Sequence, residues 1–257
     1  LVISLSMVGC EKKEDNSSEG DKEIDIAVMG GGTSFACIEI AKKEVEKQGY
    51  KLNVKTFDDF LSPNVAVYDG DVDLNFYQHE PFLNEYNKNK NTDLVKVGNS
   101  IYTFLFGIYS KKINSLEELE DGATVAIYND SSNRTMALEI LDKEGLIKIN
   151  KDKEQLLLTD IKENPKKLKF IEMDGPKVPS ALDDVDIIIG CEVDLFEQEI
   201  SANTLVTHTD EDFAWVLVAK KANANSKKAQ VVQEALTSNA VKEFIEEKYK
   251  GAVVPLF

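Results

Sequence analysis

Polar and aromatic side chains stand at the ends of several apolar segments that have the pattern of buried strands. They are Tyr77-Gln78-His79, Tyr102, the run Asn129–Arg134, and Cys191-Glu192. In open α/β sheets, ligands bind beyond the carboxyl ends of the strands, where helix N-termini also attract anions. Hydrogen-bonding groups and aromatic rings at these places therefore predict a binding site for a small molecule.

Motifs that indicate catalysis or metal binding do not occur in the sequence. It contains no GxSxG, HExxH or CxxC motif, and Cys37 and Cys191 are not spaced as a pair. Gly30-Gly31-Gly32 lacks both GxGxxG spacing and a Walker lysine. A catalytic α/β protein would need an activated nucleophile or base near His79, and no partner stands at motif spacing. We therefore expect a protein that is not an enzyme and needs no cofactor or metal.

The charge of the chain excludes other classes of partner. Its 257 residues include 30 Lys+Arg and 46 Asp+Glu, which give a net charge of −16. Such a field repels phosphate backbones and anionic lipid, so the sequence predicts no nucleic-acid partner. A hydrophobic content of 42% with 30% charged residues is typical of a globular protein. A surface interaction protein is compatible with this charge, but no motif favours it.

The N-terminal residues have the pattern of a processing signal. Leu1–Val8 is apolar and leads into Gly9-Cys10, which resembles a bacterial lipobox, where the cysteine is diacylated. Glu11–Lys22 contains no apolar residue and is expected to be a flexible tether. We interpret residues 1–9 as a truncated signal peptide and residues 10–22 as the lipidated (palmitate-bearing) cysteine and tether. The alternative is a buried strand that ends in an ordinary cysteine.

From Glu23 onward, apolar runs alternate with amphipathic stretches, which is typical of α/β layers. We expect strands over residues 24–30, 51–57, 73–78, 95–100, 102–112, 123–128, 167–174, 185–191, 204–209 and 213–221. We expect helices over residues 35–49, 61–69, 80–88, 115–122, 133–144, 178–184, 194–200 and 227–249. The strands and helices form two alternating series, the second of which begins near Ser115. They predict two lobes with a ligand cleft between them, one of residues 23–106 plus 213–257 and one of residues 107–212.

Several segments resemble a known family. They are DLNFYQHEPFL (73–83), VGNS…YSKKINSLEELEDGATVAIYNDSSN (97–133), GLIKI (145–149), ENPKKLKFIEMD (163–174) and PSALDDVDIII (179–189). In order from about Ile24 to Phe257, the chain is similar to the methionine-binding lipoproteins, also called the NlpA lipoprotein family. The resemblance implies a two-lobed periplasmic-binding-protein-like fold of type II. It also implies an extracytoplasmic, membrane-anchored monomer that captures methionine or a related amino acid or small peptide for an ABC permease and its ATPase.

The resemblance carries over to five candidate ligand-binding residues. Tyr77 and His79 match the aromatic residue and the histidine of the family's cleft motif. Tyr102 matches a position that lines the side-chain pocket, and Asn129 and Asn133 match the loop that enters the helix of the second lobe. The resemblance thus predicts that these side chains surround the ligand.

Three further positions depart from the family. Met136 stands where the family has its carboxylate-binding arginine, and Cys191 and Trp215 stand where it has asparagines. A buried carboxylate without a cation or donors costs several kcal/mol. Arg134 is the only arginine in the chain and falls in the first turn of a helix at the cleft. We expect it to bind the ligand's carboxylate, the alternative being that it points to solvent.

The replaced positions also open a second hypothesis about the ligand. Trp215 adds a flat aromatic face, and Glu192 and Asp194 add negative charge nearby. Together they would suit a divergent family member that binds an aromatic or cationic solute other than an amino acid.

The lipid anchor leads to a first prediction. Replacing Cys10 with Ala should release the mature protein into the soluble fraction, because one diacylated residue holds it to the membrane. Fractionation of cells that express the parent or Cys10→Ala measures this. A variant that stays membrane-bound through detergent-free washing would contradict the lipobox interpretation.

Overall fold

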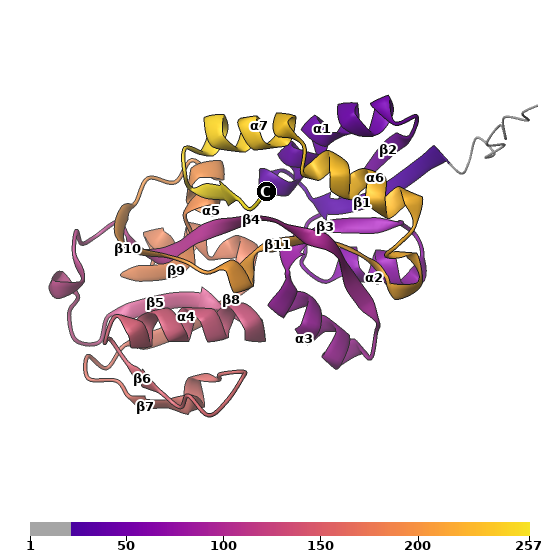
Figure 1. Ribbon diagram of the computed structural model, residues 1–257. Helices are drawn as coiled ribbons and strands as arrows, with labels where there is room; N and C mark the ends of the chain where they lie inside the picture. Colours follow the sequence, from indigo (N-terminus) through magenta and orange to yellow (C-terminus); the bar gives the residue numbers. More distant parts are fainter. Residues whose placement is uncertain (1–21) are drawn as a thin grey trace, which may run out of the picture.

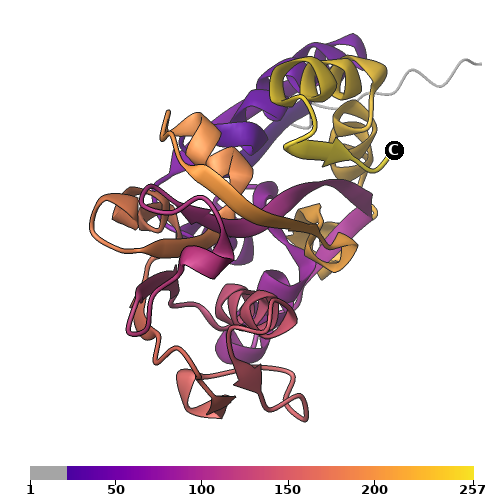
Figure 2. The same ribbon diagram turned by 90° about the vertical axis from the view of Figure 1, so that its left-hand side faces the viewer.

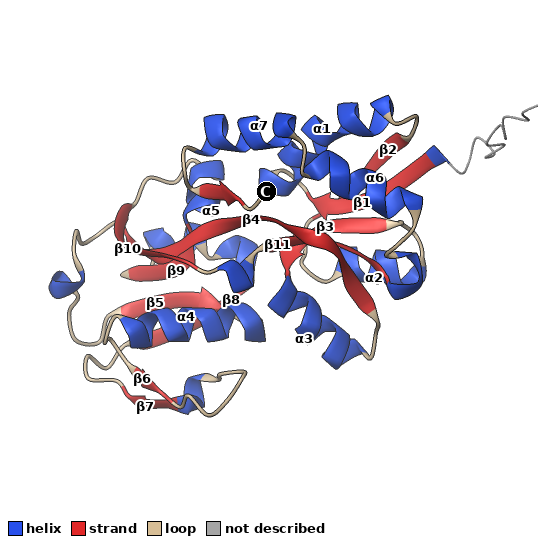
Figure 3. Cartoon of the chain, in the orientation of Figure 1, coloured by secondary structure: helices blue, strands red, loops and turns tan. Residues whose placement is uncertain are grey.

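The computed structural model describes residues 22–257, so the predicted signal peptide, Cys10 and nearly all of the predicted tether lie outside the described residues. The chain forms two lobes that share one ten-stranded sheet, in the order β2-β1-β3-β11-β4-β9-β5-β8, with β10 and β12 paired to β4 (Figures 1 and 3). Within residues 22–257, no helix has both the length and the apolar character needed to cross a membrane.

The first lobe is built on three parallel strands and one antiparallel strand. Strand β1 (Glu23–Met29) pairs in parallel with β2 (Lys51–Phe57) and β3 (Leu74–His79), and β11 (Trp215–Lys220) runs antiparallel to β3. Helices α1 (Gly32–Lys47), α6 (Lys227–Leu236) and α7 (Asn239–Tyr249) lie together on one face of this sheet. Helices α2 (Ser62–Asp69) and α3 (Glu80–Lys90) lie on the other (Figure 1). Helices α6 and α7, from the C-terminal end of the chain, both contact α1.

The second lobe repeats the layering on a smaller scale. Strand β5 (Thr124–Tyr128) pairs in parallel with β8 (Lys169–Met173) and β9 (Ile187–Cys191), and α4 (Ser131–Lys143) packs on β5. The hairpin of β6 (Lys148–Ile149) and β7 (Ile161–Glu163) lies at the end of the molecule away from α7 (Figure 2). After β9, α5 (Glu192–Glu197) packs against both β9 and α1.

One long strand takes part in the sheet of both lobes. Strand β4 (Leu94–Ser110) pairs with β11 through Leu94–Val97 and Tyr102, and then with β9 and with β10 (Asn203–Thr209) through its second half. The prediction of two separate strands, 95–100 and 102–112, is therefore wrong. Strand β4 continues past Gly98, whose φ of 61° is left-handed and lies within an irregularity of the ladder with β11, between Val97 and Tyr102. The predicted lobe boundary at residue 106 falls inside this strand.

Three of the predicted helices are also divided or shorter in the structure. The expected helix 227–249 is two helices, because Ser238 begins α7 and its hydroxyl accepts the N–H of Val241. The expected helices 115–122 and 178–184 contain only short 3-10 turns, Leu116–Glu118 and Pro179–Asp183. The sequence reasoning also missed β12 (Val253–Pro255), which pairs with β4 next to Tyr102.

Gly107 and Gly190 face each other in the β4–β9 ladder and offer a matched test of this junction. A Cβ at Gly107 would collide with the carbonyl oxygen of Val206, whereas a Cβ at Gly190 would have its nearest neighbour at 3.6 Å. Gly107→Ala should lower the free energy of unfolding by about 1–3 kcal/mol, because the backbone of β10 must shift. Gly190→Ala should stay within about 1 kcal/mol of the parent. Equal losses in chemical denaturation would contradict this account.

Candidate functional site

A cavity of about 350 Å³ lies between the lobes, which is a size typical of small-molecule sites. The first lobe contributes the turn and first residues of α1 (residues 29–34), Phe60, the end of β3, Phe104 and Trp215. The second lobe contributes Tyr128, Asn133, Gly175-Pro176, Cys191 and one face of α5. A molecule in this cavity would touch both halves of the protein.

His79 joins the two lobes at the cavity. Its Nδ1 caps α3 by accepting the N–H of Phe82 at 3.2 Å, so the proton of the neutral ring is on Nε2. Nε2 then donates to Oδ1 of Asn133 at 2.9 Å. Burial lowers the pKa of His79, which keeps the ring neutral. The histidine is therefore a fixed hydrogen-bond donor rather than a charged group.

The orientation of Asn133 is set from its other side. Asp130 caps α4 by accepting the N–H of Asn133, and the same carboxylate accepts both contacts of the Asn133 amide nitrogen, at 3.0 and 3.1 Å. The amide oxygen is thereby turned toward His79. The Asp130–Asn133–His79 chain links the first turn of α4 to the end of β3.

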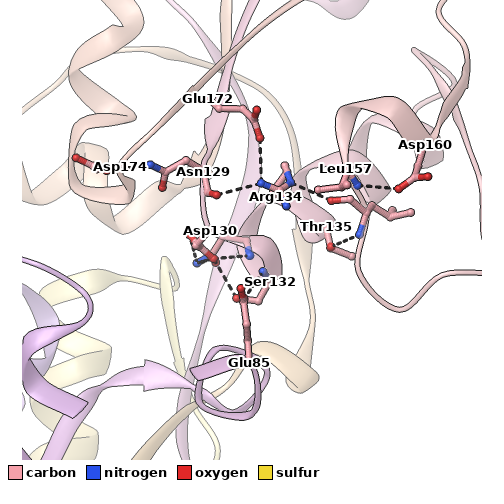
Figure 4. A network of polar contacts seen from close by, with 12 residues as sticks. Glu85, Asn129, Asp130, Ser132, Arg134, Thr135, Leu157, Asp160, Glu172 and Asp174 are labelled. Carbon is pink, nitrogen blue, oxygen red and sulfur yellow. Dashed lines mark hydrogen bonds and ion pairs between the residues drawn. The ribbon is translucent and has the colours of Figure 1, made fainter. Parts of the chain in front are cut away.

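Other contacts bring the lobes together around the same cavity. Oε2 of Glu85 in α3 accepts the backbone N–H of Ser132 in α4 at 2.9 Å (Figure 4). Oγ1 of Thr33 in α1 donates to Oε1 of Glu197 in α5 at 2.8 Å. A Cβ at Gly175 would overlap the ring of Phe60, so the bare backbone of Gly175 permits this aromatic contact.

Aromatic rings form one wall of the cavity. The Trp215 ring lies 4.2 Å from Phe104 and 5.4 Å from His79, measured between ring centroids. Tyr77 also lines the cavity, and its hydroxyl donates to the carbonyl of Phe60 at 2.7 Å. This wall can receive an apolar side chain or the flat face of a ligand.

The structure brings together five of the nine predicted site residues. The residues that line the cavity are Tyr77, His79, Asn133, Cys191 and Trp215. Their contact with a ligand stays a prediction.

The other four predicted residues do not line the cavity. Tyr102 stacks behind Trp215, and its hydroxyl is 2.8 Å from that of Ser34. Asn129 donates to Asp174 at 2.9 Å, and Met136 is buried in the core of the second lobe.

Arg134 is the fourth, and it is not among the residues that line the cavity. Its Nε donates to the carbonyl of Leu156 at 2.9 Å, and its Nη1 donates to the carbonyl of Asn129 and to Glu172, both at 3.0 Å. Through these bonds the guanidinium connects α4 to the loop before β7 and to strand β8. The geometry does not support the expected carboxylate role, and neither does it support the solvent-exposed alternative, because the side chain is only 11% exposed.

The charged groups in the cavity are carboxyls. Asp194 and Glu197 line it from one face of α5, whereas Glu192 does not. Burial, with repulsion from Glu197, raises the pKa of Asp194 to about 7. Burial also raises the pKa of Glu197. Within residues 22–257, no lysine or arginine lines the cavity.

Sequence reasoning missed Glu197, Phe60 and Phe104 as cavity residues. The i, i+3 spacing from Asp194, within the expected helix 194–200, is the signal that could have identified Glu197. No sequence signal identifies Phe60, because it lies in the loop before α2.

Comparison with known proteins agrees with this architecture. A family model described as NlpA lipoprotein matches residues 24–257. The D-methionine-binding lipoprotein MetQ of Escherichia coli K12 is 34% identical over 263 residues, covering 99% of this chain and 94% of that protein.

Two solved structures have the same fold. The structure of a nutrient-binding protein from Burkholderia cenocepacia bound to methionine has a TM-score of 0.81 at 30% identity, over 91% of this chain and 100% of that one. The substrate-binding protein of a methionine transporter from Streptococcus pneumoniae has a TM-score of 0.84 at 31% identity, over 92% and 96%. The predicted two-lobed, periplasmic-binding-protein-like fold is confirmed.

The raised pKa of Asp194 predicts a pH-dependent stability. Between the usual value of 3.8 and about 7, the folded protein binds the extra proton, so stability falls as pH rises through this window. Asp194→Asn removes the group and should raise the melting temperature by about 2–6 °C at pH 8. The gain should vanish at about pH 3, below the usual value, where the carboxyl is mostly neutral in both states.

Glu192→Gln is the control for this melting experiment, since Glu192 is on the same helix but outside the cavity lining. An equal gain for Asp194→Asn at both pH values would refute the assignment of the raised pKa.

Proposed function

The chain belongs to the NlpA lipoprotein family, and we propose that it is the solute-binding component of an ABC importer, which captures methionine or a related amino acid or small peptide. The observation that carries the proposal is the cavity between two lobes, with walls from both and a volume of about 350 Å³. A relative and two similar structures whose names refer to methionine support this class of ligand.

The cavity walls suit a methionine side chain. Trp215, Phe104, Phe60 and Tyr77 supply aromatic surface, against which a thioether packs favourably. The donor and acceptor groups of the lining belong mostly to residues that are already held in place, as His79 is by Asn133. A pre-formed apolar pocket with few polar groups is typical of small-molecule binding sites.

Release of the ligand requires the lobes to separate. Opening would break the His79–Asn133 bond and the bond from Ser132 to Glu85, both of which join α4 to the first lobe. Each is a single hydrogen bond, with a net value of about 0.5–1.5 kcal/mol for neutral partners and somewhat more for the charged one. Contacts of this strength allow a bound molecule to shift the equilibrium toward the closed form.

The partners follow from this role. We propose that the protein works as a monomer, delivers its solute to a membrane permease driven by an ATPase, and is held on the extracytoplasmic face of the membrane by a lipid on Cys10. The relative's name includes the word lipoprotein, which supports the anchor.

Ligand binding should raise the melting temperature, because a molecule that binds only the folded state stabilises it by mass action. At a hundredfold excess over Kd, L- or D-methionine should add about 5–10 °C. Trp215→Ala removes part of the cavity wall and should weaken binding about tenfold or more. Tyr68→Ala is the control, since Tyr68 is an exposed aromatic residue outside the cavity. No shift with any methionine-related compound would refute the proposed function.

A further inference from the structure

We propose that the carboxyls of Asp194 and Glu197 bind a positively charged amine of the ligand, and that the preferred ligand carries no free carboxylate in the cavity. This inference rests on the proposed function and names the chemical class more closely. The class is an amine that carries a methionine-like apolar side chain. Its carboxyl group is absent or is blocked, as in an amide.

The first support is the charge of the cavity lining. Asp194 and Glu197 are the acidic residues in the lining, and no basic residue of the described chain joins them there. Arg134, the only arginine, is already bonded to Leu156, Asn129 and Glu172. A carboxylate taken into this cavity would lose water without gaining a cation, whereas an ammonium group would gain two anionic partners.

The second support is the position of Glu197 at the N-terminus of α1. Helix α1 has 16 residues and no side-chain cap, so its first N–H groups would attract an anion. Glu197 already occupies this place, since it accepts Thr33 Oγ1 at 2.8 Å, and its Oε2 lies 2.9 Å from where a Cβ of Gly32 would stand. The protein's own carboxylate therefore competes with any anionic ligand at this helix end.

Glu197 is also held from the other side. The hydroxyl of Tyr249 in α7 donates to Glu197 Oε1 at 3.2 Å, so Thr33 and Tyr249 share one oxygen. These two bonds fix the carboxylate beside the cavity and leave Oε2 for a further donor. An ammonium group, with three N–H donors, can use that oxygen and the Asp194 carboxyl together.

The third support comes from Asp194. The titratable groups near it are the Glu197 carboxyl, the Cys191 thiol and the hydroxyls of Tyr109 and Tyr128, and in residues 22–257 no basic side chain forms an ion pair with it. The pKa of about 7 shows that the carboxylate form lacks a compensating charge. A cationic ligand would supply that charge and favour release of the proton, so affinity for an amine should rise as pH increases from about 5 to about 7, below the range in which the amine itself loses its proton.

Aromatic side chains complete an environment suited to a cation. Trp215, Phe104 and Tyr128 line the same cavity as the two carboxyls. Ring faces attract ammonium groups, most strongly where water is excluded. The aromatic wall can therefore hold either the apolar part or the charged end of an amine, and its ring faces do not attract a carboxylate.

Titration calorimetry with three matched compounds tests the inference. L-methioninamide has the amine without the carboxylate, L-methionine has both, and N-acetyl-L-methionine has only the carboxylate. We expect methioninamide to bind at least about tenfold more tightly than methionine at about pH 7, where its amine still carries a proton, and N-acetylmethionine not to bind. Asp194→Asn and Glu197→Gln should each weaken methioninamide about tenfold or more, whereas Glu192→Gln should match the parent.

The outcomes separate this inference from the proposed function. If methionine binds as tightly as methioninamide and Asp194→Asn binds both like the parent, the inference is overturned and the proposed function stands. If methioninamide binds in an Asp194-dependent way and methionine does not, the inference stands and free methionine is excluded as the solute. If none of the three compounds binds, the inference and the proposed function both fail. Melting curves of each variant without ligand show whether it is folded.

Discussion

Strand β4 places two separate α/β layers on one continuous sheet, and the geometry of the cavity follows from that connection. Its first half pairs with β11, which carries Trp215, and its second half pairs with β9, which ends at Cys191. Strands β11 and β9, which carry residues of opposite walls of the cavity, thus both pair with the same 17-residue strand. Rotation between the lobes must bend or twist β4, whose irregular pairing near Gly98 and Tyr102 lies on the first-lobe side.

The polar groups around the cavity divide into two sets with different roles. His79, Asn133 and Asp130 satisfy one another, so they position the lobes and have little capacity left for a ligand. Asp194 and Glu197 are the opposite case, because burial makes their charge costly and part of their bonding capacity faces the cavity. The first set holds the two lobes together, and the second set is the basis of our proposal for the ligand.

The sequence predicted the strands best where apolar runs are uninterrupted. The parallel strands β1 and β3 were expected within one or two residues, because strands buried on both faces have nearly continuous hydrophobic patterns. It failed at β4, where polar residues 98–100 interrupt the pattern although pairing continues on both sides. Site residues directly after such strands, such as His79, were also found. Arg134 was misplaced, because its direction depends on partners 22 and 38 residues away in the chain.

The position of Trp215 has an optical consequence. The chain contains a single tryptophan, and its indole ring lies in the cavity wall, between Phe104 and His79. Ultraviolet-excited indole emission from this protein therefore originates at one known point, without contributions from elsewhere in the chain. Entry of a molecule would displace water from beside the ring and change the polarity that the excited indole senses. The protein thus carries an intrinsic fluorophore whose colour and intensity report occupancy of the cavity without a label.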